Sequence, residues 1–158
     1  MERQTALVVD ASVAVKWFVP EVDSQAALGI RDAHANQEIS LFAPDLLGYE
    51  VANALRHRSG LSNDDLEEGI KALFELDLTL IAPTTRSISR AARLARTMDL
   101  TIYDSTYLAL AEDLNCQLVT SDKTFYDKLF TRAEKSASVV LLKDYSAEQQ
   151  RAKDRDSG

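Results

Sequence analysis

The sequence predicts an α/β fold in which a parallel sheet is covered by helices on both faces. Short apolar runs alternate with helical patterns along the 158-residue chain, which is typical of βαβ units. With 46% hydrophobic and 27% charged residues, the chain is long enough for one well-packed core and short for two. We therefore expect one domain over residues 1–146. Residues 147–158 mix charges without apolar periodicity, so we expect a solvated, disordered tail there.

The individual elements follow from apolar runs and from the residues that end them. The first run stops at Asp10, directly before a helical pattern. Pro44 after the second run suits the first turn of a helix, which Gly60 ends, and Ser62 opens the next helix. The predicted strands cover 6–9, 39–43, 77–82, 117–120 and 138–142. The other predicted helices cover 12–18, 23–36, 85–98, 101–115 and 123–129.

Cysteine content and charge limit the classes of protein and partner. Cys116 is the single cysteine, so no internal disulfide forms, which fits a reducing cytoplasm. We expect no membrane span, because no apolar stretch is long enough, and no secretory signal at residues 1–9. The net charge of −7 argues against a nucleic-acid partner. That objection is partial, because cations bound to acidic site residues would offset part of it, and it leaves room for a basic partner protein.

Three acidic residues lie where a parallel sheet would bring them to one edge. Asp10 follows the first strand and Asp122 follows the fourth, and ligands bind beyond the carboxyl ends of parallel strands. Asp104 begins a helix three residues after Thr101, which is the spacing of a capping box. Each residue has an alternative interpretation as a helix cap that does no chemistry.

Glu50 has no capping explanation, because it lies in the middle of a helix. It falls on the flank of the apolar arc of that helix, and Asn53 and His57 share its side. The alternative is a boundary glutamate that reaches solvent or pairs with Arg56.

Taken together, the four acids indicate a metal site. Carboxylates that converge on one edge repel each other and raise one another's pKa values unless cations are present. Oxygen ligands without a cysteine or histidine cluster suggest Mg²⁺ or Mn²⁺ rather than zinc.

Four segments occur in an order and spacing that resemble the PIN-domain ribonucleases, in particular the VapC-type toxins of toxin–antitoxin pairs. They are VVDAS (8–12), YEVANAL (49–55), TIYD (101–104) and LVTSD (118–122), and the resemblance spans roughly residues 6–142. It implies a PIN-like three-layer α/β/α sandwich with a five-stranded parallel sheet. It also implies a metal-dependent endoribonuclease, self-association as a homodimer or higher oligomer, and inhibition by a cognate antitoxin.

The resemblance also assigns site residues. The family's catalytic and metal-binding acids fall on Asp10, Glu50, Asp104 and Asp122. Mg²⁺ is the expected cofactor, with Mn²⁺ as a substitute. Ser12 and Thr120 match the supporting hydroxyl positions, and Asn53 is similar to a polar residue one turn after the helix glutamate. These three residues are expected to orient the ligands from behind.

Two other functions compete with the ribonuclease. A receiver-like or phosphatase domain would also place acids and Mg²⁺ at strand ends, but Lys123 and Lys143 are badly placed for its lysine and Glu50 would be unexplained. A non-catalytic binding module would use the acids only as helix caps.

Overall fold

The structure is a computed structural model that describes residues 4–131 and 138–158. Its strands are β1 (Thr5–Val9), β2 (Ile39–Pro44), β3 (Thr79–Ile81), β4 (Gln117–Thr120) and β5 (Val139–Leu141). Its helices are α1 (Ala11–Ala14), α2 (Ser24–Ala35), α3 (Leu46–Arg56), α4 (Asn63–Glu75), α5 (Thr85–Met98), α6 (Ile102–Asp113), α7 (Lys123–Thr131) and α8 (Leu142–Asp156), with a short 3₁₀ helix, η1 (Val15–Trp17), after α1.

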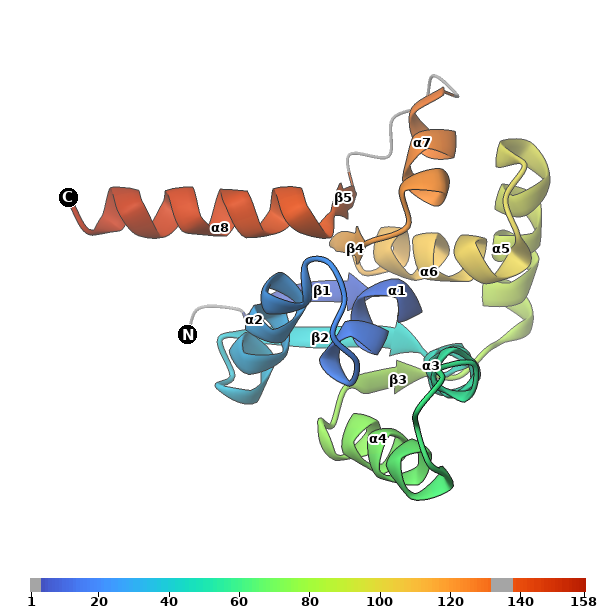
Figure 1. Cartoon of the computed structure of the whole chain (residues 1–158). Helices are drawn as coiled ribbons and strands as arrows, with labels where there is room; N and C mark the ends of the chain where they lie inside the picture. Colours follow the sequence, from blue (N-terminus) through green and yellow to red (C-terminus); the bar gives the residue numbers. More distant parts are fainter. Residues whose placement is uncertain (1–3, 132–137) are drawn as a thin grey trace.

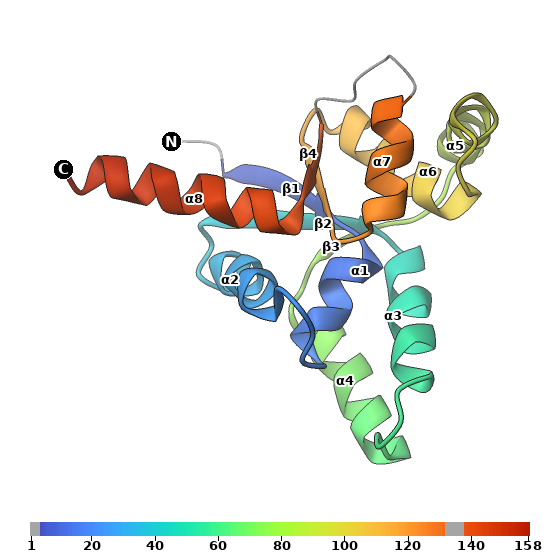
Figure 2. The ribbon, with the colours of Figure 1, turned by 45° about the horizontal axis from the view of Figure 1, so that its top comes forward.

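The five strands form one parallel sheet in the order β3-β2-β1-β4-β5. Helices α1 to α4 lie together on one side of this sheet, and α5, α6 and α7 lie on the other (Figures 1 and 2). The predicted α/β/α sandwich with a five-stranded parallel sheet is therefore confirmed.

The centre of the sheet is fully buried, as a parallel sheet between two helical layers requires. In β1, Leu7 is 1% exposed, and Val8 and Val9 are completely buried. This explains why the first strand is a continuous apolar run, since both of its faces are covered.

Strands β1 and β4 are neighbours in the sheet, and the order in which the chain adds strands changes direction between them. Successive strands are added on one side of β1 up to β3, and on the other side from β4 onward. Such a switch point is where open parallel sheets bind ligands. Receiver-like domains have the order 2-1-3-4-5, so the receiver-like alternative is wrong.

The expectation that Pro44 starts a helix is wrong. Pro44 is the last residue of β2, in register with Ile81 of β3. The Asp45 N–H then donates to the Ile81 carbonyl at 3.0 Å, so the strand pairing continues one residue beyond Pro44. Helix α3 begins only after this bond, at Leu46.

Residues 147–158, expected as a solvated, disordered tail, belong to helix α8, which runs to Asp156. The first turns of α8 are anchored by Leu142 and Tyr145, which are buried, and α8 then extends away from the body (Figure 1). An anchored first turn removes the cost of helix nucleation, and the Gln150 side chain donates to Asp154 at 3.0 Å one turn later. Residues 148–158 are exposed as expected. A helix segment whose residues are all exposed has no apolar stripe to bury.

The two longest helices of the described ranges, α8 and α5, are both rich in charged residues. Among residues 4–131 and 138–158, no helix combines the length and the apolar character that crossing a membrane requires.

Candidate active site

Asp10 lies directly after β1 and caps α1. Its Oδ1 accepts from the backbone N–H groups of Ser12 (3.1 Å) and Val13 (3.3 Å) and from the Ser12 hydroxyl (2.5 Å). Its Oδ2 accepts from the Thr120 hydroxyl at 2.5 Å. The capping interpretation is therefore correct for one oxygen. The other oxygen is held by a side chain of β4, which capping does not require.

The surroundings of Asp10 oppose its ionisation. Burial raises the pKa of Asp10 from 3.8 to about 6, and the charge of Asp104 adds to that rise. The hydrogen bonds from Ser12, Thr120 and Val13 act in the opposite direction, because they stabilise the anion. A shifted carboxylate at a ligand-binding edge is a typical property of functional sites.

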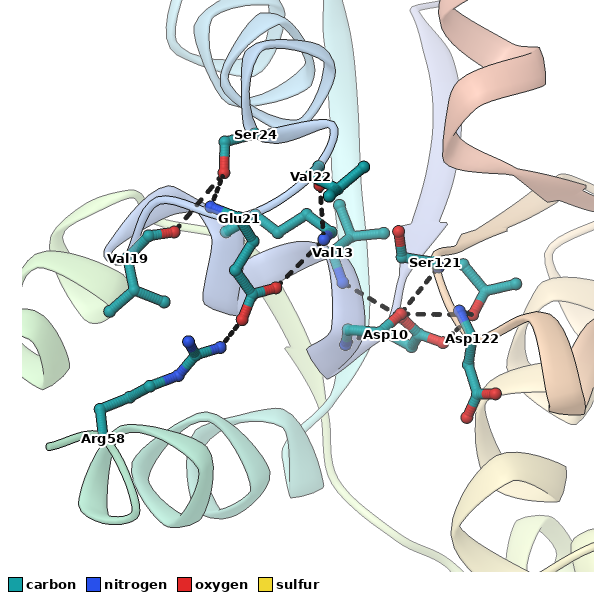
Figure 3. A network of polar contacts seen from close by, with 12 residues as sticks. Asp10, Val13, Val19, Glu21, Val22, Ser24, Arg58, Ser121 and Asp122 are labelled. Carbon is teal, nitrogen blue, oxygen red and sulfur yellow. Dashed lines mark hydrogen bonds and ion pairs between the residues drawn. The ribbon is translucent and has the colours of Figure 1, made fainter.

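Asp122 lies two residues after β4, beside Asp10 in Figure 3. Its Oδ1 accepts from the Phe125 N–H at 3.0 Å, so it caps α7. Its own N–H donates to Thr120 Oγ1 at 3.1 Å. Asp122 is exposed, and it follows β4, the strand that pairs with β1 at the switch point.

Asp104 is half-buried in the first turn of α6. Its N–H donates to Thr101 Oγ1 at 3.0 Å, which is one half of the predicted capping box. The return bond, from the Thr101 N–H to the Asp104 carboxylate, is not among the hydrogen bonds of the described residues. Burial and the charge of Asp122 raise the pKa of Asp104, while Thr101 and Lys128 lower it.

Glu50 lies mid-helix in α3, and its Oε1 is buried without a hydrogen-bond partner among the described residues. Burial raises the pKa of Glu50, and the charge of Asp104 raises it further. The Tyr107 hydroxyl is near enough to lower that pKa, yet it lies outside hydrogen-bonding geometry. Glu50 is partly exposed, and Arg56 bonds to Asn53 and His57 rather than to Glu50.

Asp104 links the four carboxylates, because each of the other three interacts with it electrostatically. The charge of Asp104 raises the pKa of both Asp10 and Glu50, and Asp122 raises the pKa of Asp104. In the described part of the chain, no three acidic, histidine or cysteine side chains are placed to ligate one ion together. The acids thus share one site, but their side chains do not form a closed cage.

The chemistry of the donors fits a hard divalent cation. All four candidate ligands are carboxylates, and Glu50 Oε1 is a buried acceptor that lacks a donor. Asp10 Oδ2 has one donor, from Thr120, and retains a lone pair for a further ligand. Such oxygen donors suit Mg²⁺ or Mn²⁺ better than zinc.

The predicted supporting residues fall into two groups. Ser12 and Thr120 both donate to Asp10 at 2.5 Å, and Ser12 Oγ also accepts from the Ser121 N–H at 2.8 Å. Their two side chains tie the ends of β1 and β4 together. Asn53 is exposed, and its Oδ1 accepts from Arg56 at 3.2 Å, so the structure does not bring Asn53 to a carboxylate.

Tyr107 is the residue of this site that sequence reasoning missed. It is 2% exposed, and its hydroxyl has no partner among the described residues. It follows Asp104 by three residues on α6, so both share one helix side. That spacing is the signal that could have revealed it.

A second polar network, also drawn in Figure 3, supports the helix that Asp10 caps. Lys16 Nζ donates to Glu21 Oε2 at 3.1 Å and to the Val22 carbonyl at 2.7 Å. Glu21 also pairs with Arg58, which lies just beyond the end of α3. Because Lys16 is 8% exposed, this network fixes η1 and the following loop against α3.

Comparisons with known proteins agree on one family. The profile of the PIN domain matches residues 7–129. Ribonuclease VapC3 of Pyrobaculum aerophilum is 34% identical over 126 residues, which cover 77% of this chain and 93% of that relative.

Two solved structures share the fold. One is VapC20 of Mycobacterium tuberculosis, a sarcin-ricin loop cleaving toxin, with a TM-score of 0.61 and 13% identity over 77% of this chain and 93% of that one. The other is VapBC2 of Rickettsia felis bound to a DNA fragment from its promoter, with a TM-score of 0.59 and 11% identity over 87% of this chain and 97% of that one. At these identities the likeness concerns the fold alone.

Proposed function

Because this chain belongs to the PIN-domain family and is of the VapC type, we propose that it is a metal-dependent endoribonuclease that hydrolyses RNA phosphodiester bonds. The observation that carries the proposal is the cluster in which Asp10, Glu50 and Asp122 each interact electrostatically with Asp104. In that cluster Glu50 Oε1 is buried without a partner in hydrogen-bonding geometry among the described residues. Helix capping accounts for the carboxylates of Asp10 and Asp122, but not for those of Asp104 and Glu50.

In this proposal Asp10 and Asp104 are the principal ligands of Mg²⁺, for which Mn²⁺ can substitute, and Glu50 and Asp122 complete the site directly or through water. A bound divalent cation would offset the charge at the scissile phosphate and lower the pKa of an attacking water. The chain's own task is to keep the four acids ionised and oriented. Asp122 is the exposed member of the set, Glu50 and Asp104 are partly buried, and Asp10 is buried.

Ser12 and Thr120 are proposed to hold Asp10 in its ligating orientation. Their hydroxyls donate to opposite oxygens of the carboxylate, which fixes its plane. Asn53 is bonded to Arg56 and has no part in this arrangement.

The partners follow from the same family. We propose that the chain is the toxin of a type II toxin–antitoxin pair, acts on RNA in the cytoplasm, is inhibited by a cognate antitoxin, and forms a homodimer or higher oligomer. The net charge of −7 is compatible with RNA because bound cations offset the acidic site itself, and it suits a basic antitoxin surface.

The test is cleavage of labelled RNA by the chain purified free of antitoxin. We expect cleavage with Mg²⁺ or Mn²⁺, none with chelator, and none by Asp10→Ala in either metal. Equal cleavage in chelator, or full activity of Asp10→Ala, would overturn the proposal. The non-catalytic binding module predicts instead that no preparation cleaves RNA and that Asp10→Ala loses only the cap, about 1 kcal/mol of stability.

A further inference from the structure

Helix α5 is the most positively charged of the described helices. Its sequence, TRSISRAARLARTM, holds four arginines and no acidic residue, whereas the whole chain has a net charge of −7. The arginines follow one another at spacings of four, three and three residues, at positions 86, 90, 93 and 96. Positive charge is therefore concentrated on one helix of an acidic chain.

Helix stability does not explain this charge pattern. Like charges three or four residues apart repel each other on a helix surface. Arg86 lies near the start of α5, where the first turn contains no acidic residue, and the helix dipole disfavours a positive charge there. The dipole favours only Arg96, in the last turn. By contrast, α4 begins with Asp64 and Asp65, which suit the dipole.

One of the four arginines anchors α5, and the other three are available to a ligand. Arg90 pairs with Glu112 at 2.5 Å and with Asp113, which ties α5 to α6. Within residues 4–131 and 138–158, the exposed arginines of α5 that make no ion pair are Arg86, Arg93 and Arg96. We call these three the α5 arginines.

The position of α5 connects these arginines to the acidic site. Helix α5 lies on the side of the molecule toward which the strands point (Figure 1), and Asp10 follows the end of β1 on that side. Only residues 99–101 separate α5 from α6, whose first turn contains Asp104. Lys128 of α7 donates to the Asp99 carbonyl at 3.3 Å, so a further cation lies at this turn. Positive charge thus begins beside the first turn of α6 and continues for about 15 Å along α5.

Resting on the proposed function, we propose that the α5 arginines bind phosphates of the RNA strand outside the scissile bond. A guanidinium group suits a phosphate, because its N–H donors form a planar fork that can bind two oxygens. Contacts of this kind position a nucleic acid without reading its sequence. They give a chain of net negative charge a surface on which to hold RNA.

The experiment compares two variants that lose the same number of positive charges. The α5 variant combines Arg86→Gln, Arg93→Gln and Arg96→Gln. The matched control, the α8 variant, changes three exposed cations of α8 and combines Arg151→Gln, Lys153→Gln and Arg155→Gln. The two variants therefore have equal net charge and differ in where the charge is lost.

Fluorescence anisotropy of a labelled, random-sequence single-stranded RNA measures binding in chelator at several salt concentrations. We expect the α5 variant to bind at least about tenfold more weakly at low salt, while the α8 variant keeps wild-type affinity. The slope of the logarithm of affinity against the logarithm of salt concentration should fall in magnitude by about 2, because each phosphate contact to a single strand contributes about 0.7.

Two further measurements separate binding from folding and chemistry. The melting temperature of the α5 variant should equal or exceed that of the wild type, because repulsion between like charges is removed. In Mg²⁺ its KM should rise while its kcat stays nearly unchanged, since the α5 arginines do not contact the reacting phosphate. A variant with lysine at the same three positions keeps the charge and should retain the salt slope.

Equal weakening in the α5 and α8 variants would overturn the proposal, because net charge and not its location would then be responsible. Wild-type affinity in the α5 variant would also overturn it, and an acidic partner protein would then be the better ligand for α5. So would a wild type that binds no RNA at low salt. A wild type that binds RNA but does not cleave it with Mg²⁺ contradicts the proposed function instead, since binding in chelator is measured independently of cleavage.

Discussion

Asp10 and Glu50 lie in the same acidic site but have opposite surroundings. Asp10 accepts four hydrogen bonds, from Ser12, Val13 and Thr120. Glu50 Oε1 is buried and accepts none from the described residues. Burial raises the pKa of both, and the groups that oppose this rise are Ser12, Thr120 and Val13 at Asp10 but only Tyr107 at Glu50. Hydrogen bonds within the chain therefore hold the Asp10 carboxylate in place. The Glu50 carboxylate is held by fewer such bonds.

The largest expected effect comes from neutralising either acid. Asp10→Asn and Glu50→Gln should each reduce RNA cleavage about a thousandfold, because a metal ligand contributes several kcal/mol to charge stabilisation in the transition state. Single-turnover cleavage with Mg²⁺ measures this. If Glu50→Gln retained more than about a tenth of wild-type activity, Glu50 would be a passive neighbour and the two sides would not be parts of one site.

The same Glu50→Gln variant should be more stable than wild type in chelator at pH 8. Burial of an ionised Glu50 without a donor costs stability, and the amide removes the charge. Chemical denaturation in chelator compares the two free energies of unfolding. A less stable variant would mean that the Glu50 carboxylate already has a stabilising partner.

The pH dependence of stability measures how much free energy of unfolding is lost when the buried Asp10 carboxylate ionises. Burial raises the pKa of Asp10 from 3.8 to about 6, so the folded chain binds more protons than the unfolded chain between these values. The contribution of Asp10 to the free energy of unfolding therefore falls by about 3 kcal/mol as the pH rises from about 4 to about 6.

Denaturation of the metal-free wild type and of Asp10→Asn at pH 4.5 and pH 7.5 tests this. The wild type should lose more stability than the variant across this interval. Parallel changes in the two proteins would show that Asp10 carries no such cost.

Removing a hydrogen-bond donor to Asp10 should leave its carboxylate as poorly bonded as that of Glu50. Thr120→Val deletes the hydroxyl that donates to Asp10 Oδ2, which raises the pKa of Asp10 further. Cleavage should fall about 10–100-fold, and the pH midpoint of activity should rise. Thr106→Val is the control, because the Thr106 hydroxyl donates to the Ile102 carbonyl of its own helix and should leave both quantities unchanged.

The smallest effect is expected far from either acid. Residues 148–158 are exposed along α8, and deletion of surface groups typically changes stability by about 0.5 kcal/mol or less. A chain ending at residue 147 should therefore cleave RNA like the full chain and show nearly the same melting temperature. A loss of cleavage would mean that α8 takes part in the site and that the domain does not end near residue 146.

Sequence reasoning succeeded where local pattern decides the structure. The apolar run before Asp10 and the LVTSD segment before Asp122 identify strands buried on both faces, and parallel strands must end at one edge. The resemblance to the PIN-domain ribonucleases identifies Ser12 and Thr120 as supporting hydroxyls, and both donate to Asp10. Sequence reasoning failed where tertiary contacts decide: Pro44 stays in β2 because Asp45 continues the pairing with β3.

The Glu50 side was the harder one to predict. Tyr107 looks like an ordinary core residue in the sequence, and only the meeting of α3 and α6 brings its hydroxyl to Glu50. Asn53 shares a helix side with Glu50, but its side chain bonds to Arg56 instead. Helix periodicity gives the face of a residue but not the partner that it finds there.

One divalent-cation site is proposed among these four acids. The most direct measurement is anomalous scattering from a crystal of the chain soaked in Mn²⁺. We expect a peak about 2.1 Å from carboxylate oxygens of Asp10 and Asp104. A peak elsewhere, or none while Asp10 and Asp122 remain as simple helix caps, would contradict it.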